Sequence, residues 1–282
     1  MKYEGDVYRP PSEAKSLIIQ LTVGCARNSC TFCSMYKNKR FRVRELSEVV
    51  EDLYWVKKRY PFGFERVFLA DGDALIVKTP LLLAVLDKIY ELFPHVQRVS
   101  TYGAAADVLL KSPEELLELR RHGLEMVYIG AETGSDRIFQ AVNKNITAAE
   151  TIEACLKLKA AGIKVSMTLM SGLGGKPLTR ENALESARLV SAAKPEYLGL
   201  MTLYVYPDTP LGKQCREGSF QELSPLEMLE EQKLFLENVD SEGTVLRSNH
   251  VSNFVSLAGT LNRDRDTMLL QLEQAIKRAK EL

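Results

Sequence analysis

The order of apolar and polar positions along the chain predicts short strands that alternate with longer helices. Six short runs have the length and the β-branched and aromatic content of buried strands. These runs are Ser16–Thr22, Arg66–Ala70, Arg98–Tyr102, Met126–Ala131, Lys164–Met170 and Tyr197–Tyr204. Between them apolar residues recur at helical spacing in Leu46–Tyr60, Pro80–Phe93, Pro113–His122, Ala148–Ala161 and Arg180–Ala193. Because a helix is the usual connection between parallel strands, this alternation predicts an α/β fold with a parallel sheet.

Small, polar or unusual residues follow each predicted strand. Examples are the cysteine-containing loop after the first strand, Asp71-Gly72-Asp73 after the second and Glu132-Thr133-Gly134 after the fourth. In barrels built from βα units, functional groups gather where the strands end. Six units are fewer than the eight of a full barrel, so we expect a partial, TIM-like (β/α)6 barrel with a lateral opening.

The pattern changes after about Leu211. Two further helices are expected, over Pro225–Asn238 and Asp264–Leu282, and the polar segment between them contains His250 and Asn253. We interpret that segment first as a loop held by its own hydrogen bonds. The predicted organisation is a barrel over residues 1–210 and a short, mainly helical extension over residues 211–282 that packs on the barrel.

Composition narrows the class of protein. The 282 residues carry 37 basic and 37 acidic side chains, so no net charge draws the chain to nucleic acid or to a membrane. Five cysteines, three of them crowded together, do not suit a secreted disulfide framework and favour the reducing cytoplasm. The first residues have no apolar signal sequence, and no apolar run approaches the ~20 residues of a membrane span.

The most informative motif is Gly24-Cys25-Ala-Arg-Asn-Ser-Cys30-Thr-Phe-Cys33, directly after the first predicted strand. Three thiolates so close together suit one soft metal centre. A [4Fe–4S] cluster takes four cysteines as a rule. Three would leave one iron open for a ligand that takes part in chemistry. The alternative is zinc, but a structural zinc site wants four ligands, and the other cysteines and histidines supply no second Cys-x2-Cys pair.

With this loop and the order of the later strand-end motifs, the chain resembles the radical S-adenosylmethionine (SAM) enzymes over roughly residues 16–210. The resemblance implies a [4Fe–4S] cluster held by Cys25, Cys30 and Cys33, whose open iron binds SAM. It also implies reductive cleavage of SAM to a 5′-deoxyadenosyl radical that takes hydrogen from a substrate. The usual spacing is Cys-x3-Cys-x2-Cys, and this chain has one more residue in the first gap.

The resemblance also assigns SAM contacts by position. Phe32 corresponds to the aromatic residue near the adenine, and Gly72 with Asp73 to the Gly-Gly-Glu segment at the SAM amino group, where glutamate is more usual. Glu132 resembles the polar residue at the ribose or methionine part. The remaining expected contacts are Thr101, Lys144, Gly172 and Gly174, the glycines lying in a segment that approaches the adenine.

A second group of residues has a plainer interpretation. Asp71 and Asp73 are too few carboxylates for a magnesium or calcium site. Five cations between Lys37 and Arg44 form either a solvated loop or a contact for an anionic substrate, RNA or an acidic electron donor. Cys155 is expected in a helix core, and Cys215 in an exposed, charged stretch.

The sequence therefore predicts a radical SAM enzyme whose segment Tyr206–Leu211 resembles the branch of oxygen-independent coproporphyrinogen oxidase, the methylthiotransferases and the elongator-type enzymes. We expect a small-molecule substrate and an electron donor such as flavodoxin or ferredoxin. The chain lacks the length for a cobalamin domain and the cysteines for a second cluster. The alternatives are an RNA-modifying radical SAM enzyme and a non-catalytic zinc or iron–sulfur module.

Overall fold

The computed structural model describes residue 1 and residues 3–281, so Leu282, the end of the last predicted helix, lies outside the described residues. The chain forms two compact units. Unit 1 comprises Met1–Asn28, Met35–Ile129 and Leu156–Val165. Unit 2 comprises Ser29–Ser34, Gly130–Cys155 and Ser166–Leu282. The loop with the three cysteines thus contributes Cys25 to unit 1 and both Cys30 and Cys33 to unit 2.

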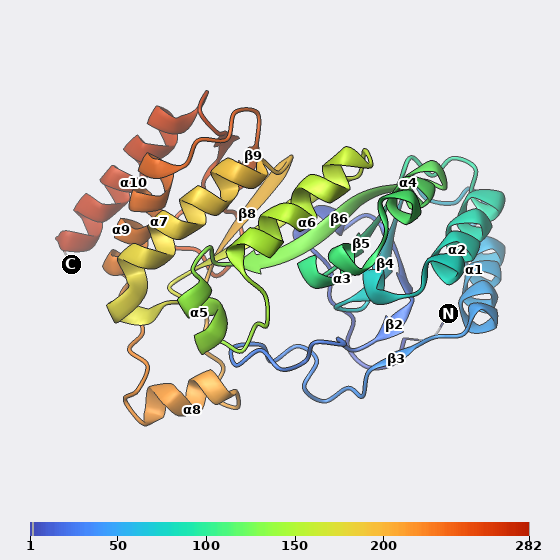
Figure 1. The fold of residues 1–282 in the computed structure, drawn as a ribbon, viewed down its shortest axis with the longest axis horizontal. Coiled ribbons are helices and arrows are strands. Elements are labelled where there is room, and N and C mark those ends of the chain that lie inside the picture. The colour runs from blue at the N-terminus through green and yellow to red at the C-terminus, as the bar shows by residue number, and fades with distance from the viewer. Residues whose placement is uncertain (2, 282) are drawn as a thin grey trace. The chain divides into compact units, whose positions relative to one another are not determined.

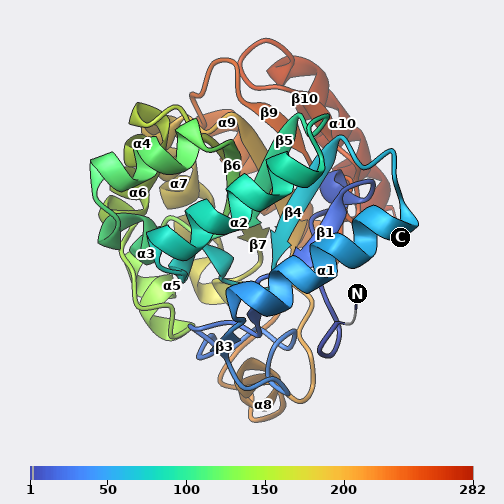
Figure 2. The same cartoon turned by 90° about the vertical axis from the view of Figure 1, so that its right-hand side faces the viewer.

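Unit 1 is built on a parallel sheet in which β1, β4, β5 and β6 are neighbours in that order (Figure 1). The strands are β1 (Leu17–Gln20), β4 (Arg66–Ala70), β5 (Arg98–Tyr102) and β6 (Leu124–Glu132). The helices are α1 (Leu46–Arg59), α2 (Thr79–Leu92), α3 (Ala105–Leu110) and α4 (Pro113–Arg121), with one-turn helices η1 (Pro11–Glu13) and η2 (Ala74–Ile76). A separate two-stranded ribbon pairs β2 (Thr22–Val23) with β3 (Arg42–Val43). Helices α1 and α2 pack side by side (Figure 2).

An aromatic group fills the inner face of the unit 1 sheet. The ring of Phe68, on β4, meets those of Tyr102 and Tyr128 edge-on, with centroids 4.9 and 5.8 Å apart. Below it the buried carboxylate of Glu13 accepts hydrogen bonds from Tyr128 (2.6 Å) and Ser100 (2.9 Å). The N-terminal segment is therefore tied to β5 and β6 by a polar contact beneath an apolar layer.

Unit 2 carries a second set of strands. Strand β8 (Tyr197–Thr202) lies between β7 (Lys164–Ser171) and β9 (Val245–Arg247), all parallel, and β10 (Ala258–Thr260) runs antiparallel to β9. The helices are α5 (Asp136–Ala141), α6 (Ala148–Ala160), α7 (Gly175–Ala193), α8 (Pro210–Arg216), α9 (Pro225–Asn238) and α10 (Arg265–Lys280). Strands β6 and β7 and helix α6 each contain residues of both units. Helix α9 packs against both α7 and α10 (Figure 1).

Most predicted elements are present. Helices α4 and α9 begin where expected, each with a capping box in which Ser112 or Ser224 accepts from the backbone three residues on. Helix α7 begins earlier than predicted, at Gly175. The short α3, α5, α8, β9 and β10 were not expected, because three to seven residues show too little periodicity. Among the described residues, no helix combines the length and the apolar character that crossing a membrane would require.

Replacing Phe68 with alanine should lower the free energy of unfolding by about 3–5 kcal/mol, because the side chain is fully buried and leaves a cavity between two rings. Urea denaturation followed by circular dichroism measures this. Phe62→Ala is the matched control, since that ring is 95% exposed and its loss should change stability by less than about 0.5 kcal/mol. Equal effects of the two substitutions would contradict the assignment of the core.

Candidate functional site

In unit 1 the buried carboxylate of Asp71, directly after β4, holds both ends of the cysteine loop. Its Oδ2 accepts hydrogen bonds from the backbone N–H of Gly24 at 3.0 Å and from the ammonium of Lys39 at 2.7 Å. The side-chain amide of Gln20 donates to the same oxygen at 3.0 Å. The backbone N–H of Asp71 in turn donates to Thr22 Oγ1 at 3.1 Å. The start and the end of the loop are therefore fixed to the strand end by one charge.

Gly72 follows Asp71, and a residue with a side chain could replace it only if the Tyr36 ring moved. A Cβ at this position would lie 2.4 Å from Cε2 of the buried Tyr36 ring. Tyr36 also comes from the segment after the cysteines, and its ring packs edge-on against Tyr8 with centroids 5.6 Å apart. The missing side chain therefore lets the backbone after β4 pass directly beneath the segment that follows the cysteine loop.

Asp73 is almost fully buried and faces a second carboxyl group. Its Oδ1 accepts from the backbone N–H of Ala104 at 3.3 Å, and Arg27, from the cysteine loop, lies 4.0 Å from its Oδ2. Burial, and then the hydrogen-bonded neighbour Asp107, raise the pKa of Asp73 to about 8. The guanidinium of Arg27 pairs with Asp107 at 2.6 Å. Two carboxyl groups thus share one cation, an arrangement that favours holding one proton between them.

Thr101 is buried on β5, and its hydroxyl donates to the backbone carbonyl of Leu69 at 3.1 Å. This hydrogen bond ties β5 to β4. The expected SAM contact of Thr101 stays a prediction.

In unit 2 the middle of the cysteine loop is pinned from two sides. The N–H of Thr31, between Cys30 and Cys33, donates to the carbonyl of Val142 at 3.0 Å. The N–H of Leu211 donates to the carbonyl of Thr31 at 3.0 Å. The segment Tyr206–Leu211, singled out in the sequence for its resemblance to one branch of a family, therefore has a structural task at this loop.

Phe32 packs against an apolar cluster that includes Leu173, from the glycine-rich segment, and Ile138 from α5. The Cβ that Gly174 lacks would lie 2.9 Å from Cδ1 of Ile138. Within unit 2 the structure therefore brings Phe32 and the glycine-rich segment to one apolar cluster, and their contact with adenine stays a prediction.

Glu132 and Lys144, both predicted from the sequence, lie together in unit 2. Glu132 Oε1 is 3.4 Å from Lys144 Nζ, and among the described residues Glu132 Oε2 is buried without a hydrogen-bond partner. Glu132 also has a φ of 69°, which is strained for a residue with a side chain. A strained, partly unsatisfied carboxylate at a strand end is typical of a ligand contact.

The glycine-rich segment is held by a carboxyl group that the sequence analysis missed. Glu231, on α9, accepts from the N–H of Gly172 at 2.7 Å, from Thr179 at 2.7 Å and from the amide of Asn182 at 3.0 Å. Asn182 Oδ1 also accepts from Thr133 at 2.7 Å, one residue after Glu132. Helix α9 therefore links the ends of β6 and β7 through buried hydrogen bonds.

Four of the five cations between Lys37 and Arg44 are engaged within unit 1. Lys37 donates to the carbonyl of Asn28, Lys39 to Asp71, Arg42 to Glu48 and Arg44 to Asp52. Arg40 lies on the exposed side of the same segment. Most of these cations are thus paired with carboxylates or hydrogen-bonded to a carbonyl of the same unit. This supports the interpretation of the segment as a loop over its interpretation as a contact for an anionic partner.

Residues outside the cysteine loop take the structural roles predicted for them. Cys155 is fully buried in α6, and Cys215 is partly exposed. Asn253 donates to the carbonyls of Leu200 (2.7 Å) and Ser248 (2.9 Å), so the loop that contains His250 is tied to β8. None of the five cysteines, all of which lie among the described residues, is in a disulfide.

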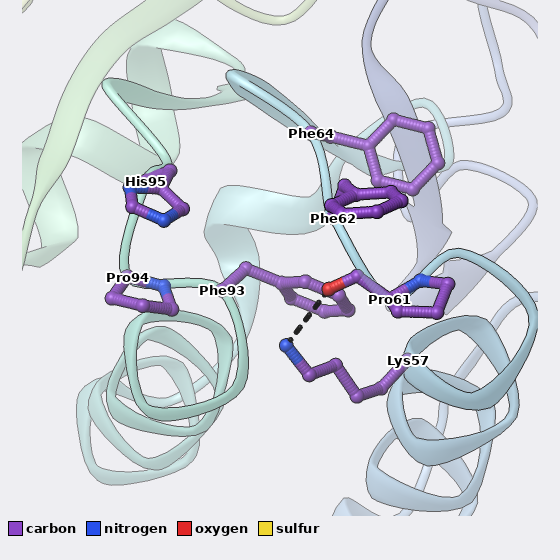
Figure 3. A pocket seen from close by; sticks show the side chains of 7 residues that line it. All are labelled: Lys57, Pro61, Phe62, Phe64, Phe93, Pro94 and His95. Atoms are coloured by element: carbon purple, nitrogen blue, oxygen red, sulfur yellow. Dashed lines mark hydrogen bonds between the residues drawn. The ribbon is translucent and has the colours of Figure 1, made fainter.

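A hollow of about 150 Å³ in unit 1 lies away from these residues (Figure 3). It is lined by Lys57, Phe62, Phe64, Phe93 and His95 with two prolines, where α1 and α2 end and the chain enters β4 and β5. Lys57 donates to the carbonyl of Pro61 at 3.2 Å and lies over the Phe93 ring. This is the edge of the strands opposite to Asp71 and Thr101, so the hollow belongs to the connections and not to the candidate site.

Among the described residues, no group of three or more His, Cys, Asp or Glu side chains is already arranged to hold a metal ion. A single site formed by Cys25, Cys30 and Cys33 therefore rests on their spacing in the sequence and on the donor chemistry of three thiols. The structure adds that the ends of their loop and its middle are each fixed by buried or backbone hydrogen bonds.

Comparison with known proteins decides the family. A family model described as the radical SAM superfamily matches residues 19–190, which include the three cysteines and the glycine-rich segment. This chain belongs to the radical SAM superfamily. Its members are enzymes that use a [4Fe–4S] cluster and SAM, so the predicted enzyme class and cofactors are confirmed at the level of the superfamily.

Individual relatives are distant. An anaerobic magnesium-protoporphyrin IX monomethyl ester cyclase of Cereibacter sphaeroides is 26% identical over 219 residues, 77% of this chain but 34% of the cyclase. The chain thus spans about a third of the length of that curated relative.

Two solved structures show the fold. The structure of methylornithine synthase has a TM-score of 0.55 and 18% identity, covering 92% of this chain and 81% of the synthase. The methyltransferase TsrM of Kitasatospora setae, solved with cobalamin and a [4Fe–4S] cluster, has a TM-score of 0.57 and 18% identity over 72% of this chain and 39% of its own. The likeness confirms the predicted fold class, a TIM-like partial barrel of α/β type.

Asp71→Asn should weaken cluster binding by this radical SAM chain. Asparagine keeps an oxygen for Gln20 and Gly24 but leaves the ammonium of Lys39 without its anion, at a cost of about 3 kcal/mol. Iron per chain after anaerobic reconstitution should fall, and urea unfolding should shift to lower concentration. The control is Asp87→Asn, since that carboxylate is exposed and pairs with His122. Normal iron content in the Asp71 variant would contradict the role of this carboxylate.

Glu231→Gln should change how stability depends on pH. Burial raises the pKa of Glu231 to about 7, against hydrogen bonds from Gly172 and Asn182 that lower it. The folded chain therefore keeps a proton that the unfolded chain has lost between about pH 4.5 and pH 7. The free energy of unfolding then falls as pH rises through this window, by roughly 3 kcal/mol, and changes no further above it.

The glutamine variant lacks this loss, so it should match the parent at pH 4.5 and exceed its stability at pH 8. Urea unfolding at a series of pH values measures the difference. Glu230→Gln is the matched control, because the neighbouring carboxylate is exposed and pairs with Lys280. A constant difference across the range would show that Glu231 is ionised throughout.

Proposed function

We propose that this chain is the catalytic core of a radical SAM enzyme in which Cys25, Cys30 and Cys33 hold a [4Fe–4S] cluster. The observation that carries the proposal is the three-thiol loop itself, with both ends fixed to Asp71 and its middle fixed at Thr31. Three ligands leave one iron open for SAM. When bound, the cluster supplies the electron that cleaves SAM to methionine and a 5′-deoxyadenosyl radical, which takes a hydrogen atom from the substrate.

The residues of each unit fit the group they would hold. In unit 1 Gly72 lets the backbone after β4 pack directly against the Tyr36 ring, and Asp73 and Asp107, which follow it, provide carboxyl oxygens for the ammonium of an amino acid moiety. In unit 2 the unpartnered oxygen of Glu132 suits a hydroxyl or ammonium donor. Gly172 and Gly174 let their backbone pack closely against Met228 and Ile138, and Phe32, in the same apolar cluster, would contact a flat base.

The chain's own part in the reaction is to position groups and exclude water. Asp71 and Leu211 fix the backbone that carries the thiols, and Glu231 fixes the backbone of Gly172. Because the binding groups are already held in place, the reaction requires no further loss of conformational entropy to order them. Lys144 Nζ, 3.4 Å from Glu132 Oε1, orients that carboxylate.

A small molecule is the proposed substrate. The cations between Lys37 and Arg44, which were the reason to consider RNA, are largely engaged within unit 1. By their names, the Cereibacter relative acts on a tetrapyrrole ester and the synthase makes an amino acid, and both are small molecules. These relatives support a small-molecule substrate without indicating which one.

The proposed reaction needs an electron donor, and a flavodoxin or ferredoxin is the class we propose. The lack of disulfides among the five described cysteines and the oxygen sensitivity of the proposed cluster suit the reducing cytoplasm.

The chain reconstituted with iron and sulfide should form 5′-deoxyadenosine when given dithionite and SAM without oxygen. Cys30→Ser should lower this by at least about a hundredfold, because one cluster ligand is lost. Chromatography of the nucleoside and iron analysis give the two readings. Cys215→Ser, a substitution of a partly exposed thiol outside the loop, should leave both unchanged.

A fully loaded cluster that forms no 5′-deoxyadenosine would contradict the proposal. Zinc in place of iron would favour the binding-module alternative. Salt-sensitive binding of tRNA by the loaded chain would favour the RNA-modifying alternative, because phosphate contacts weaken as salt rises.

A further inference from the structure

One face of the unit 2 sheet is covered by helices and the other is not. Leu169, Ser171 and Leu200 face a small interior space that they share with Asn182 of α7 and Glu231 of α9. Because successive residues of a strand point to opposite faces, Thr168, Gly199 and Met201 lie on the other face. These residues are partly exposed, whereas their neighbours on the helical side are buried. We call this second side the open face.

The open face carries a row of three residues across adjacent strands. Thr168 on β7 is in register with Gly199 on β8, and Gly199 with Arg247 on β9. Strands lie about 4.8 Å apart, so the outer two side chains flank a gap of roughly 10 Å whose centre has no side chain. A Cβ on Gly199 would lie 3.7 Å from Thr168 Oγ1, which confirms that the hydroxyl borders the gap.

The polar groups of this row have few partners in the protein. Among the described residues no carboxylate lies within 4.0 Å of the exposed Arg247, which donates only to the carbonyl of its neighbour Leu246, at 2.7 Å. The hydroxyl of Thr168 has no side-chain hydrogen bond within that part of the chain. Parallel sheets are as a rule covered on both faces, so an open face with a cation and a free hydroxyl around a notch is a place for a ligand.

We propose that Arg247, Gly199 and Thr168 form a subsite for the carboxylate of a small-molecule substrate. This rests on the proposed function for its reaction and names the substrate class. The planar guanidinium of Arg247 donates two parallel hydrogen bonds to the carboxylate, and Thr168 donates a third. Gly199 leaves the space, and Met201, one position further along the same face, contacts the apolar part of the molecule next to the carboxylate.

A carboxylate fits better than a phosphate group. One guanidinium neutralises one negative charge, and its fork matches two oxygens in a plane. A phosphate monoester brings up to two charges and three acceptor oxygens. The one lysine of β7 and β8 on the open face, Lys164, lies four residues before Thr168 and so roughly 13 Å from it along the strand, and neither strand has an arginine.

The strand geometry also limits the length of the molecule. Thr168 precedes Gly172 by four residues on the same chain segment. At about 3.3 Å for each residue, the carboxylate would be held roughly 13 Å along β7 from the backbone of Gly172. The reacting carbon is therefore expected several bonds from the carboxylate, beyond Met201.

The subsite can be tested by arginine modification of the full chain. Phenylglyoxal labels accessible guanidinium groups, and peptide mass spectrometry gives the rate at each arginine. The probes are 3-phenylpropionate, 3-phenylpropanol and inorganic phosphate. We expect 3-phenylpropionate at saturation to slow labelling of Arg247 by at least about threefold, by occupying the guanidinium. The alcohol and phosphate should not. Arg278, exposed on α10, is the internal control and should show no protection.

Two variants keep Arg247 in place and change its surroundings. Thr168→Val removes the hydroxyl at nearly constant volume and should raise the concentration needed for protection about fivefold. Gly199→Val fills the notch and should abolish protection while Arg247 remains reactive. Circular dichroism and urea unfolding establish that both variants fold. If Gly199→Val does not fold, Gly199→Ala, whose Cβ makes only ordinary contacts, replaces it.

The labelling is measured with and without the reconstituted cluster, so it does not depend on SAM cleavage. No protection at Arg247, or equal protection at Arg278, would overturn the subsite even if 5′-deoxyadenosine is formed. Protection by phosphate as strong as by the carboxylate would overturn the assignment of the ligand class. Specific protection in a chain that never cleaves SAM would keep the subsite and reject the proposed reaction.

Discussion

The buried charge of Asp71 is the contact on which the candidate site in unit 1 depends. One carboxylate oxygen accepts from a backbone amide before the cysteines, from an ammonium after them and from a side-chain amide on β1. A carboxylate without these donors would be costly to bury, and the donors without the carboxylate would be equally unsatisfied. The loop that carries the thiols is thereby fixed to the strand end, and Gly72 and Asp73, next along the chain, take up positions that follow from it.

Helix α9 has a comparable role in unit 2. Its Glu231 reaches the glycine-rich segment and, through Asn182, the residue after Glu132. The helices that follow the predicted barrel are therefore more than a cover for apolar surface. They bring a carboxyl group to the backbone amide of Gly172 and to the side chains of Thr179 and Asn182, and this joins the C-terminal helices to the position of the expected SAM contacts.

The sequence was sufficient for features that depend on local pattern. Strand and helix positions follow from periodicity and capping residues, and the strand-end series correctly placed Asp73, Glu132 and Gly172 at or just after the ends of strands. It could not reveal contacts that depend on distant partners. From the sequence, Asp71 was considered only as a metal ligand and set aside, because its partners Lys39 and Gly24 lie more than thirty residues away. Glu231 was indistinguishable from the other acidic residues of its helix. The partners of the charged run from Lys37 were hidden for the same reason, since the carboxylates that engage it are not adjacent in the chain. Strands β9 and β10 are too short to be recognised at all.

The strands of the unit 2 sheet meet a different requirement on each face: packing on one side and a freely variable surface on the other. Residues turned toward α7 and α9 are locked in a packed interior, where almost any change would disturb folding. Residues turned the other way, such as Gly199, can change size or polarity while the strand stays in place. Alternate positions along one strand can therefore diverge at different rates, so that a lineage can acquire new chemical specificity on an unaltered framework. On this view, the even positions of β8 are constrained by the packing of the fold, and the odd positions by the molecules that the open face binds.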